Sequence, residues 1–481
     1  MDHDTQEPQW NNSDQNSFAY QSARDRWPII ITGVIDDVHK AVGVTEVAGA
    51  EWDGKQVISK LAALKYELQH NRQLTPLEGN FDDIQRYNAE LTARSPLHWH
   101  TAPWLFSECY MYRRMSLIFQ DSQYWKTYDF FSNVKNSTFR SSRKAVLELT
   151  HKYNAIAAQL TSPPASFASA TPEQRREADL LLFTEMCEIS LWGNATDLSL
   201  LASASYVDIA SLQGAEARKR AEKNILVNDV PAAFSSLWDL RERDPKSERR
   251  VDIVLDNSGF ELFVDAVLAA YLIKANLATT IVFHPKDMPW FVSDVTPKDF
   301  STLFQVLLNA KSLYETPSET EKANGVTPVS LTADEEKELQ TLAEDWMFMY
   351  TEGKFVLRPN GFWTEGGSFW RLPKEKPDLM EDLRKAELVV FKGDLNYRKL
   401  LADAKWAPTT PFSKALGPLG PGSGLRVLSL RTCKGDVIAG LPEGRDEELK
   451  AMEGGGGDSG ARKWAWTGKW AVIEYCDGKE G

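Results

Sequence analysis

The chain has 481 residues, of which 42% are hydrophobic, and its formal net charge is -13. At roughly 150 residues per domain, this length predicts two or three domains with a substantial core. So acidic a balance argues against a general nucleic-acid binder, although a local basic pocket for phosphate is compatible with it. The four cysteines lie far apart and form no C-x-x-C pair, which argues against a zinc site or a disulfide framework and fits a reducing compartment.

Residues 1–24 are polar and acidic, and they carry neither the basic nor the apolar region of a secretory signal. We expect them to be a disordered tail that contributes nothing to the core. No apolar run in the sequence is long enough to span a membrane. We therefore expect a cytoplasmic protein, or a cytoplasmic and nuclear one, with no membrane, nucleic-acid or obligatory protein partner.

Residues 25–245 are predicted to form a helical domain, because apolar residues recur at helical spacing along most of this stretch. One helix is expected to begin at Pro103, and its polar residues, including Glu108, could reach a neighbouring site. Further helices are predicted at 145–160, 172–191 and 232–240, with a turn at 192–197. The charged run 241–250 contains a proline, so we expect a solvated linker at the domain boundary.

From residue 246 to 481, strands and helices alternate, which predicts an α/β domain with a doubly wound, mostly parallel sheet. Strands are expected at 251–255, 279–283, 388–391, 425–430 and 470–475. An additional hairpin is predicted at 355–363, around the turn Asn360-Gly361.

The first of these strands ends on Asp256-Asn257, directly before a helical pattern. Ser258 and Glu261 have the spacing of a capping box, with a hydroxyl at the N-cap and a carboxylate three residues later. Ligands of open α/β sheets bind outside the carboxyl ends of the strands, and an oxygen-rich pair there suits Mg²⁺ or Mn²⁺. Taken alone, the stretch is better explained by Asp256 supporting the helix start and Asn257 lying in a turn.

Polar side chains also follow three further predicted strands. They are Asp294 after the second, Asp394, Asn396 and Arg398 after the third, and Arg431 and Lys434 after the fourth. In a doubly wound sheet these ends converge on one edge. Three carboxylates beside several cations are costly in a protein interior unless a divalent metal neutralises the acids and an anion meets the bases. The pattern therefore indicates metal-assisted phosphoryl transfer or phosphate ester hydrolysis.

Other nucleotide and ester chemistries fit the sequence poorly. The first strand is not followed by G-x-G-x-x-G, and neither G-x-x-x-x-G-K-[ST] nor G-x-S-x-G occurs. Their absence argues against a dinucleotide fold, a P-loop and a serine nucleophile elbow.

Several contiguous segments resemble the signatures of the damage-control phosphatase family, namely 256–261, 283–286, 289–294 and 392–400. The segment Arg431-Thr432-Cys433-Lys434 matches the R-T-x-K motif of its third branch, the sugar-phosphate phosphatases, which also includes an acidic residue methyltransferase. Residues 103–114 and 191–198 resemble the same branch, so the similarity covers most of the chain. The resemblance implies a helical N-terminal domain packed on an α/β/α C-terminal domain, with one divalent metal between the sheet edge and the substrate.

On this resemblance the metal ligands are Asp256, Asn257 and Asp294, and the metal is Mn²⁺, Co²⁺, Ni²⁺ or Mg²⁺. The same three residues contact the substrate, together with Asp394, Leu395, Asn396, Tyr397, Arg398, Arg431 and Lys434. The candidate catalytic residues are Asp256, Asp394 and Lys434. Lys434 would stabilise the phosphoryl oxygens, Asp394 would orient water or bind sugar hydroxyls, and Asp256 would hold the metal or attack phosphorus. The implied activity is hydrolysis of small sugar phosphates, such as fructose 1-phosphate and fructose 6-phosphate, in metabolite damage control.

The resemblance leaves an alternative open, an S-adenosylmethionine-dependent protein-glutamate O-methyltransferase with Glu261 near the cofactor. Two features weigh against it: the capping box already gives Glu261 a role, and no glycine-rich loop follows the first strand. A third interpretation is a helical scaffold with a vestigial site. The polar residues at four strand ends argue against that one.

Overall fold

The computed structural model describes residues 4–162, 171–193, 223–316 and 327–480. A seven-stranded sheet lies at its centre, in the spatial order β1-β7-β6-β5-β2-β3-β4. The strands are β1 (Ile225–Asn228), β2 (Arg250–Val254), β3 (Thr280–His284), β4 (Phe355–Leu357), β5 (Leu388–Lys392), β6 (Val427–Thr432) and β7 (Ala471–Cys476). Neighbouring strands are parallel except for β6 and β7. The predicted α/β class with a mostly parallel sheet is confirmed.

Helices cover both faces of the sheet, which explains the continuous apolar runs of its central strands. In β5, Leu388 and Val390 face one core and Val389 and Phe391 face the other. The first face packs on α7 (Arg143–Thr161), α9 (Pro172–Trp192), α12 (Val230–Arg243), α13 (Phe260–Lys274), α14 (Pro297–Leu308), α15 (Ala310–Glu315) and α17 (Ala333–Thr351). The second packs on shorter helices, α18 (Leu372–Glu375), α19 (Pro377–Leu383), α20 (Gly393–Leu400), α21 (Phe412–Ala415) and α22 (Arg445–Ala451).

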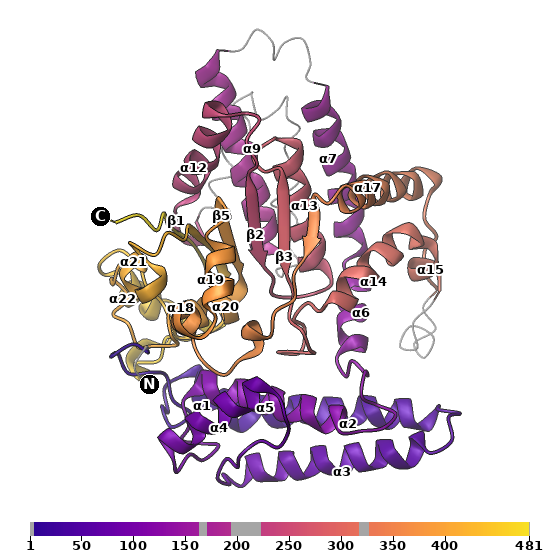
Figure 1. The fold of residues 1–481 in the computed structure, drawn as a ribbon, viewed down its shortest axis with the longest axis vertical. Coiled ribbons are helices and arrows are strands. Elements are labelled where there is room, and N and C mark those ends of the chain that lie inside the picture. The colour runs from indigo at the N-terminus through magenta and orange to yellow at the C-terminus, as the bar shows by residue number, and fades with distance from the viewer. Residues whose placement is uncertain (1–3, 163–170, 194–222, 317–326, 481) are drawn as a thin grey trace.

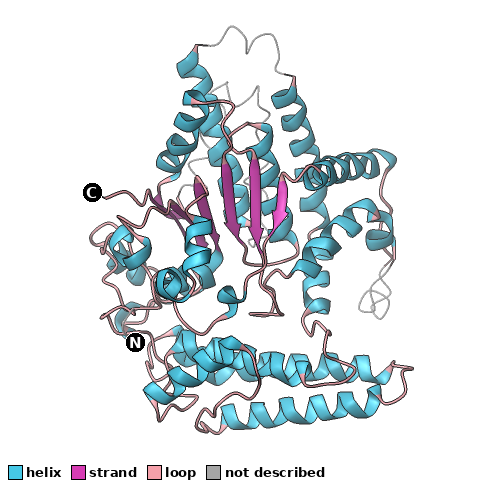
Figure 2. Cartoon of the chain, viewed as in Figure 1, coloured by secondary structure: helices cyan, strands magenta, loops and turns pink. Residues whose placement is uncertain are grey.

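A separate group of helices lies across the carboxyl ends of the parallel strands. The arrowheads of β2 and β3 point toward it (Figures 1 and 2). This helical layer comprises α1 (Phe18–Gln21), a π-helix (Ser22–Arg26), α2 (Trp27–Gly43), α3 (Ala50–Gln69), α4 (Asp82–Arg94) and α5 (Trp104–Gln120), and α6 (Ser132–Ser141) joins it to the sheet domain. Its core includes Trp290 from the loop after β3 and Leu395 from α20, the helix that directly follows β5. The layer therefore packs directly on the strand-end loops that carry the predicted site.

The packing divides the chain differently from the expected boundaries at 24 and 245. The core of the helical layer extends from Ala19 to Phe131, whereas α7, α9 and α12 pack on the sheet. The expected helical domain also contains a strand, since β1 pairs with β7. We propose a helical unit that ends near residue 131, followed by the α/β unit.

Residues 4–24 are packed on the body of the protein, so the expectation of a disordered tail is wrong for this stretch. Trp10 N donates to Asp403 O at 2.9 Å, and Trp104 N donates to Trp10 O at the same distance. Asn12 and Ala19 are fully buried. The segment is polar overall, but its few apolar side chains and its backbone find partners that lie far away in the sequence.

Two further expectations differ from the structure. The charged run 241–250 is solvated only in part, since residues 242–246 and 248 are exposed but Arg249 is fully buried and donates to the carbonyl oxygens of Asp244 and Ser247. The prediction of a hairpin at 355–363 is wrong as well. β4 pairs in parallel with β3, and the Asn360 side chain accepts a hydrogen bond from Phe362 N at 2.9 Å, which caps a 3₁₀ helix in place of a hairpin turn.

No helix of the described residues has the length and apolar character needed to cross a membrane. Of the turn predicted at 192–197 and the motif at 191–198, residues 194–198 lie outside the described residues.

Candidate metal and phosphate site

The loops after β2 and β3 join to bring the three predicted metal ligands together. Val295 N donates to Asp256 O at 2.9 Å, and Ser258 N donates to Ser293 O at 2.7 Å. Asn257 and Asp294 form an isolated antiparallel bridge. Backbone hydrogen bonds therefore hold the segments of Asp256, Asn257 and Asp294 side by side. They follow β2 and β3, whose carboxyl ends face the helical layer (Figure 1).

The side chain of Asn257 links two carboxylates. Its Nδ2 donates to Asp256 Oδ2 and to Glu261 Oε2, each at 2.7 Å, while its Oδ1 accepts from Ser293 Oγ. On the other side of Asp256 stands Gly393, the first residue after β5. The acidic cluster of Asp256, Glu261 and Asp294 is thus enclosed by an amide and by bare backbone.

Burial makes this cluster electrostatically unfavourable without added positive charge. Burial raises the pKa of Asp256 well above its usual range, and the carboxylates of Glu261 and Asp294 raise it further. The pKa of Asp294 is raised to about 6, again mainly by burial, although Lys286 opposes the shift. The Lys286 ammonium lies 3.4 Å from Asp294 Oδ2 and donates to Leu255 O at 2.8 Å. Lys286 is thus shared between Asp294 and a carbonyl, and no ion pair among the described residues reaches Asp256.

These residues fit a hard divalent cation. Asp294 Oδ2 is buried, and its ion-pair partner Lys286 does not complete a hydrogen bond to it. Two carboxylates with an amide oxygen are ligands that Mg²⁺ and Mn²⁺ accept. In the described part of the chain, no three His, Cys, Asp and Glu side chains group closely enough to hold a metal by themselves, so a metal site here would need the Asn257 oxygen beside the carboxylates. A half-turn of its amide, whose two ends have nearly the same shape, would point Oδ1 toward Asp256.

The capping box predicted at Ser258 and Glu261 is wrong. Helix α13 starts at Phe260, and its N-cap is Gly259, which has a φ of 68°. Ser258 Oγ has no hydrogen-bond partner among the described residues, whereas Glu261 accepts from Asn257. The sequence spacing could not reveal this, because it depends on the left-handed turn at the glycine.

A buried group of residues that no sequence motif had indicated lies behind Glu261. The Lys392 ammonium lies 3.6 Å from Glu261 Oε1 and 2.7 Å from Asp265 Oδ1, and it donates to Ser190 O at 2.6 Å. Burial raises the pKa of Asp265 to about 6, and Lys392 opposes the shift. A usable signal was present, since Asp265 interrupts an apolar helix and Lys392 ends an apolar strand.

The basic side of the site is formed by α20 and the loop after β6. Asp394 Oδ1 accepts from Arg431 Nε at 2.8 Å and from Lys434 N at 3.0 Å. Arg431 is fully buried and also donates to the carbonyl oxygens of Gly435 and Val437. Arg431 therefore shapes the loop and holds Asp394, so its guanidinium is largely occupied by the protein.

Lys434 is in a different situation from Arg431. Its side chain is half-buried, and its ammonium makes no ion pair or hydrogen bond with a described residue. Its charge lowers the pKa of Asp256 against the effect of burial, so it lies within electrostatic reach of the acidic cluster. Lys434 is the predicted substrate residue whose charge is available to a phosphate.

The other predicted residues of α20 are held by protein partners. Leu395 packs in the core of the helical layer. Asn396 Nδ2 donates to Lys392 O at 2.7 Å, and Tyr397 OH donates to Glu474 Oε2 at the same distance. These side chains fix the position of the helix behind Asp394.

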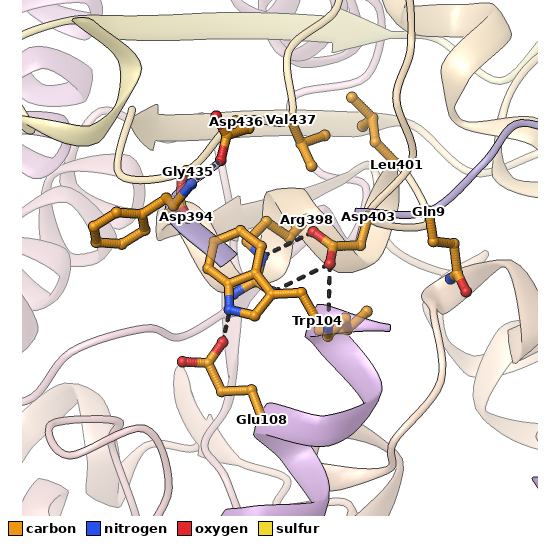
Figure 3. A network of polar contacts seen from close by, with 12 residues as sticks. Gln9, Trp104, Glu108, Asp394, Arg398, Leu401, Asp403, Gly435, Asp436 and Val437 are labelled. Carbon is orange, nitrogen blue, oxygen red and sulfur yellow. Dashed lines mark hydrogen bonds and ion pairs between the residues drawn. The ribbon is translucent and has the colours of Figure 1, made fainter. Parts of the chain in front are cut away.

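Arg398 lies in the centre of a buried network (Figure 3). Its guanidinium donates to Glu108 Oε2 at 2.8 Å and to Asp403 Oδ1 at 2.9 Å, and it lies 3.4 Å from the ring centroid of Trp104. Glu108, a residue of α5 that could have reached a neighbouring site, is instead paired internally with Arg398. This pair ties the helical layer to α20.

The sequence model of the damage-control phosphatase ARMT1-like domain matches residues 22–449. The chain is 33% identical over 473 residues to the Mus musculus protein named damage-control phosphatase ARMT1, covering 96% of this chain and 97% of the relative. The Homo sapiens protein of that name is 33% identical over 476 residues, with the same coverage. Among solved structures, a DUF89 family protein from Pyrococcus horikoshii aligns with a TM-score of 0.35 and 14% identity, covering 80% of this chain and 90% of that chain.

Proposed function

Because the chain belongs to the ARMT1-like damage-control phosphatases, we propose that it is a divalent-metal-dependent phosphatase of small sugar phosphates, of the fructose 1-phosphate and fructose 6-phosphate type. One observation carries this proposal. A buried acidic cluster lies within electrostatic reach of Lys434, whose ammonium has no ion-pair or hydrogen-bond partner among the described residues. An acidic cluster that needs a metal, next to a cation that needs an anion, matches the requirements of phosphate ester hydrolysis.

Asp256, Asn257 and Asp294 would hold the cation, which could be Mn²⁺, Co²⁺, Ni²⁺ or Mg²⁺. When bound, such an ion polarises a phosphoryl oxygen and screens the charge of the ester. Lys286 lies 3.4 Å from Asp294, and Lys392 lies 3.6 Å from Glu261 but is shared with Asp265 at 2.7 Å. The remaining negative charge is therefore concentrated around Asp256.

Lys434 would stabilise the phosphoryl oxygens as they become equatorial, because an ammonium on a flexible stem can follow a moving charge. Asp394 keeps one carboxylate oxygen, Oδ1, on Arg431 and on the backbone of Lys434. Its other oxygen is then available to orient water or to bind sugar hydroxyls. Asp256 is either a metal ligand or the attacking nucleophile, and both roles require it to be ionised at the moment of reaction.

The rival assignment, a methyltransferase, rests on Glu261. No contact of Glu261 among the described residues favours that assignment. The Glu261 side chain is buried, accepts from Asn257 and faces Lys392. These contacts assign Glu261 to the acidic cluster of the proposed phosphatase site.

A substrate screen tests the proposal. Purified, metal-free protein is supplied with Mn²⁺, Co²⁺, Ni²⁺ or Mg²⁺ and with a panel of hexose and pentose phosphates, and phosphate release is measured. We expect release only when a divalent metal is present, and fastest from fructose phosphates. Methyl transfer from S-adenosylmethionine to an acidic protein, without any phosphate release, would instead support the rival activity.

A further inference from the structure

The N-terminal segment reaches the site through a π-helix that ends at Arg26. The next residue, Trp27, is fully buried, and its Nε1 donates to Glu108 Oε1 at 3.2 Å. Glu108 is the partner of Arg398 behind α20. Arg26 therefore directly precedes, in the sequence, a residue that is hydrogen-bonded to the network of Figure 3. Short π-helical turns are frequent at functional sites.

Two aromatic side chains, Phe18 and Trp104, lie between the Arg26 side chain and Asp394. The Arg26 guanidinium lies 5.8 Å from the centroid of the Phe18 ring. The Phe18 ring in turn lies 5.9 Å from Trp104, and Phe18 N donates to Asp436 Oδ2 at 2.8 Å. At Gly435 an added Cβ would stand 3.2 Å from the Trp104 ring and 3.1 Å from Asp394 Oδ2. The side of the site that carries Asp394 is therefore extended by a row of three side chains, those of Trp104, Phe18 and Arg26.

The charge of Arg26 is available to a ligand. Its side chain is exposed, and it makes no ion pair or hydrogen bond with a residue that the structure describes. It also acts on the buried hydroxyl of Tyr112: burial and Glu108 raise the pKa of this group, Arg26 lowers it, and Asp294 raises it again. Arg26 is thus within electrostatic reach of a group that also senses the acidic cluster.

We propose that Arg26 is a further substrate-binding residue, which joins Lys434 in binding the phosphate dianion of the substrate. The inference rests on the proposed function and adds a residue that its motifs do not contain. A guanidinium presents paired donors that match phosphate oxygens. On a chain with a net charge of -13, an unpaired arginine at the rim of the site would also raise the local concentration of an anionic substrate.

The test compares Arg26→Gln with Arg72→Gln. Arg72 is also exposed, and its guanidinium lies 5.9 Å from the centroid of the Tyr66 ring. It follows α3, the helix that lies on the side of the helical layer away from the sheet (Figure 1). For a fructose phosphate at saturating Mn²⁺, Arg26→Gln should raise KM by roughly tenfold, the scale for one partly exposed charge-assisted contact. The kcat and the Mn²⁺ affinity should stay within twofold of wild type. Arg26→Lys should recover part of the loss, and Arg72→Gln should match wild type.

Calorimetric binding of inorganic phosphate to the Mn²⁺-loaded protein gives a second readout that does not need turnover. Weaker phosphate binding by Arg26→Gln than by Arg72→Gln supports the inference even if the fructose phosphates are not hydrolysed, which would count against the proposed substrates alone. Equal phosphate binding and equal KM in all variants would overturn the inference. A lower melting temperature with unchanged KM would assign Arg26 a purely structural role and overturn it as well.

Discussion

Gly393 and Asp256 are packed so closely that no other residue fits at position 393. A Cβ on Gly393 would lie 1.8 Å from Asp256 Oδ2, and the glycine has a φ of 80°, in the left-handed region. The contact explains why a glycine precedes Asp394. It lets the Asp256 carboxylate lie against the backbone where β5 ends and α20 begins.

We expect Gly393→Ala to lose metal binding and to reduce phosphatase turnover by at least about a hundredfold, because the methyl group must displace Asp256. Gly353→Ala is the matched control, since Gly353 has a φ of 69° but open space around its Cβ position. Both variants should lose about 1–2 kcal/mol of stability from backbone strain. If Gly393→Ala kept full Mn²⁺ affinity, the close packing would have no role in the site.

Asp256→Asn should have opposite effects on stability and on metal binding. Burial and two neighbouring carboxylates raise the pKa of Asp256, so a neutral amide should leave the metal-free protein as stable as wild type or more stable. Mn²⁺ affinity and turnover should be lost. Melting temperatures with a chelator and with Mn²⁺ check both points. A destabilised chelated variant that still gained stability from Mn²⁺ would contradict the assignment of Asp256 as a ligand.

Lys434→Met should keep the metal and the fold but reduce turnover by roughly 10²–10³, the scale for losing one preorganised donor. Cys433→Ala is the control next to it. Burial raises the pKa of the Cys433 thiol to about 12, so this group is neutral at physiological pH and is assigned no role. Both variants are assayed on one fructose phosphate at saturating Mn²⁺. An inactive Cys433→Ala with an active Lys434→Met would require a thiol mechanism.

The N-terminal segment should be essential for stability. Asn12 is fully buried, and its Nδ2 donates to Trp99 O and Ser107 Oγ, each at 2.8 Å. Asn12→Ala removes both bonds and should cost about 1–3 kcal/mol. The exposed neighbour Ser13 provides the control, because Ser13→Ala should be nearly neutral. Urea unfolding of both variants measures the difference, and equal midpoints would show that the segment adds little to the fold.

Glu474 should make stability depend on pH. Burial raises its folded-state pKa to about 8, while hydrogen bonding by Tyr397 and the charge of Arg431 oppose the shift. Between the usual value for glutamate, about 4.3, and about 8, the folded state holds a proton that the unfolded chain has lost. The free energy of unfolding should therefore be highest at the acid end of this window and fall as pH rises to 8. Glu474→Gln should flatten this fall in urea titrations at pH 5.5 and 8.5, and an unchanged slope would contradict the assignment.

The sequence predicted the parts of the site that depend on position along a strand. Asp256 and Asp294 were identified because apolar, β-branched runs mark where parallel strands end. It failed where the answer depends on a distant partner or on one dihedral angle. Lys392 is paired by Asp265 and Glu261 from another element, and the left-handed turn at Gly259 removes the expected cap. Trp10 belongs to no periodic pattern of apolar residues, because it is a single residue whose backbone N–H donates to the carbonyl oxygen of the distant Asp403.

Strand β7 has a consequence for how the protein is made. It pairs with β6 on one side and with β1 on the other, so it inserts between two strands that are already present when it is synthesised. Until then β1 has no neighbour in the sheet. During translation, β1 therefore cannot pair in the sheet until β7, a segment made far later in the chain, has been synthesised. Such long-range strand pairing forms slowly. This edge of the sheet is therefore the part that a growing chain can complete only after β7 has been made.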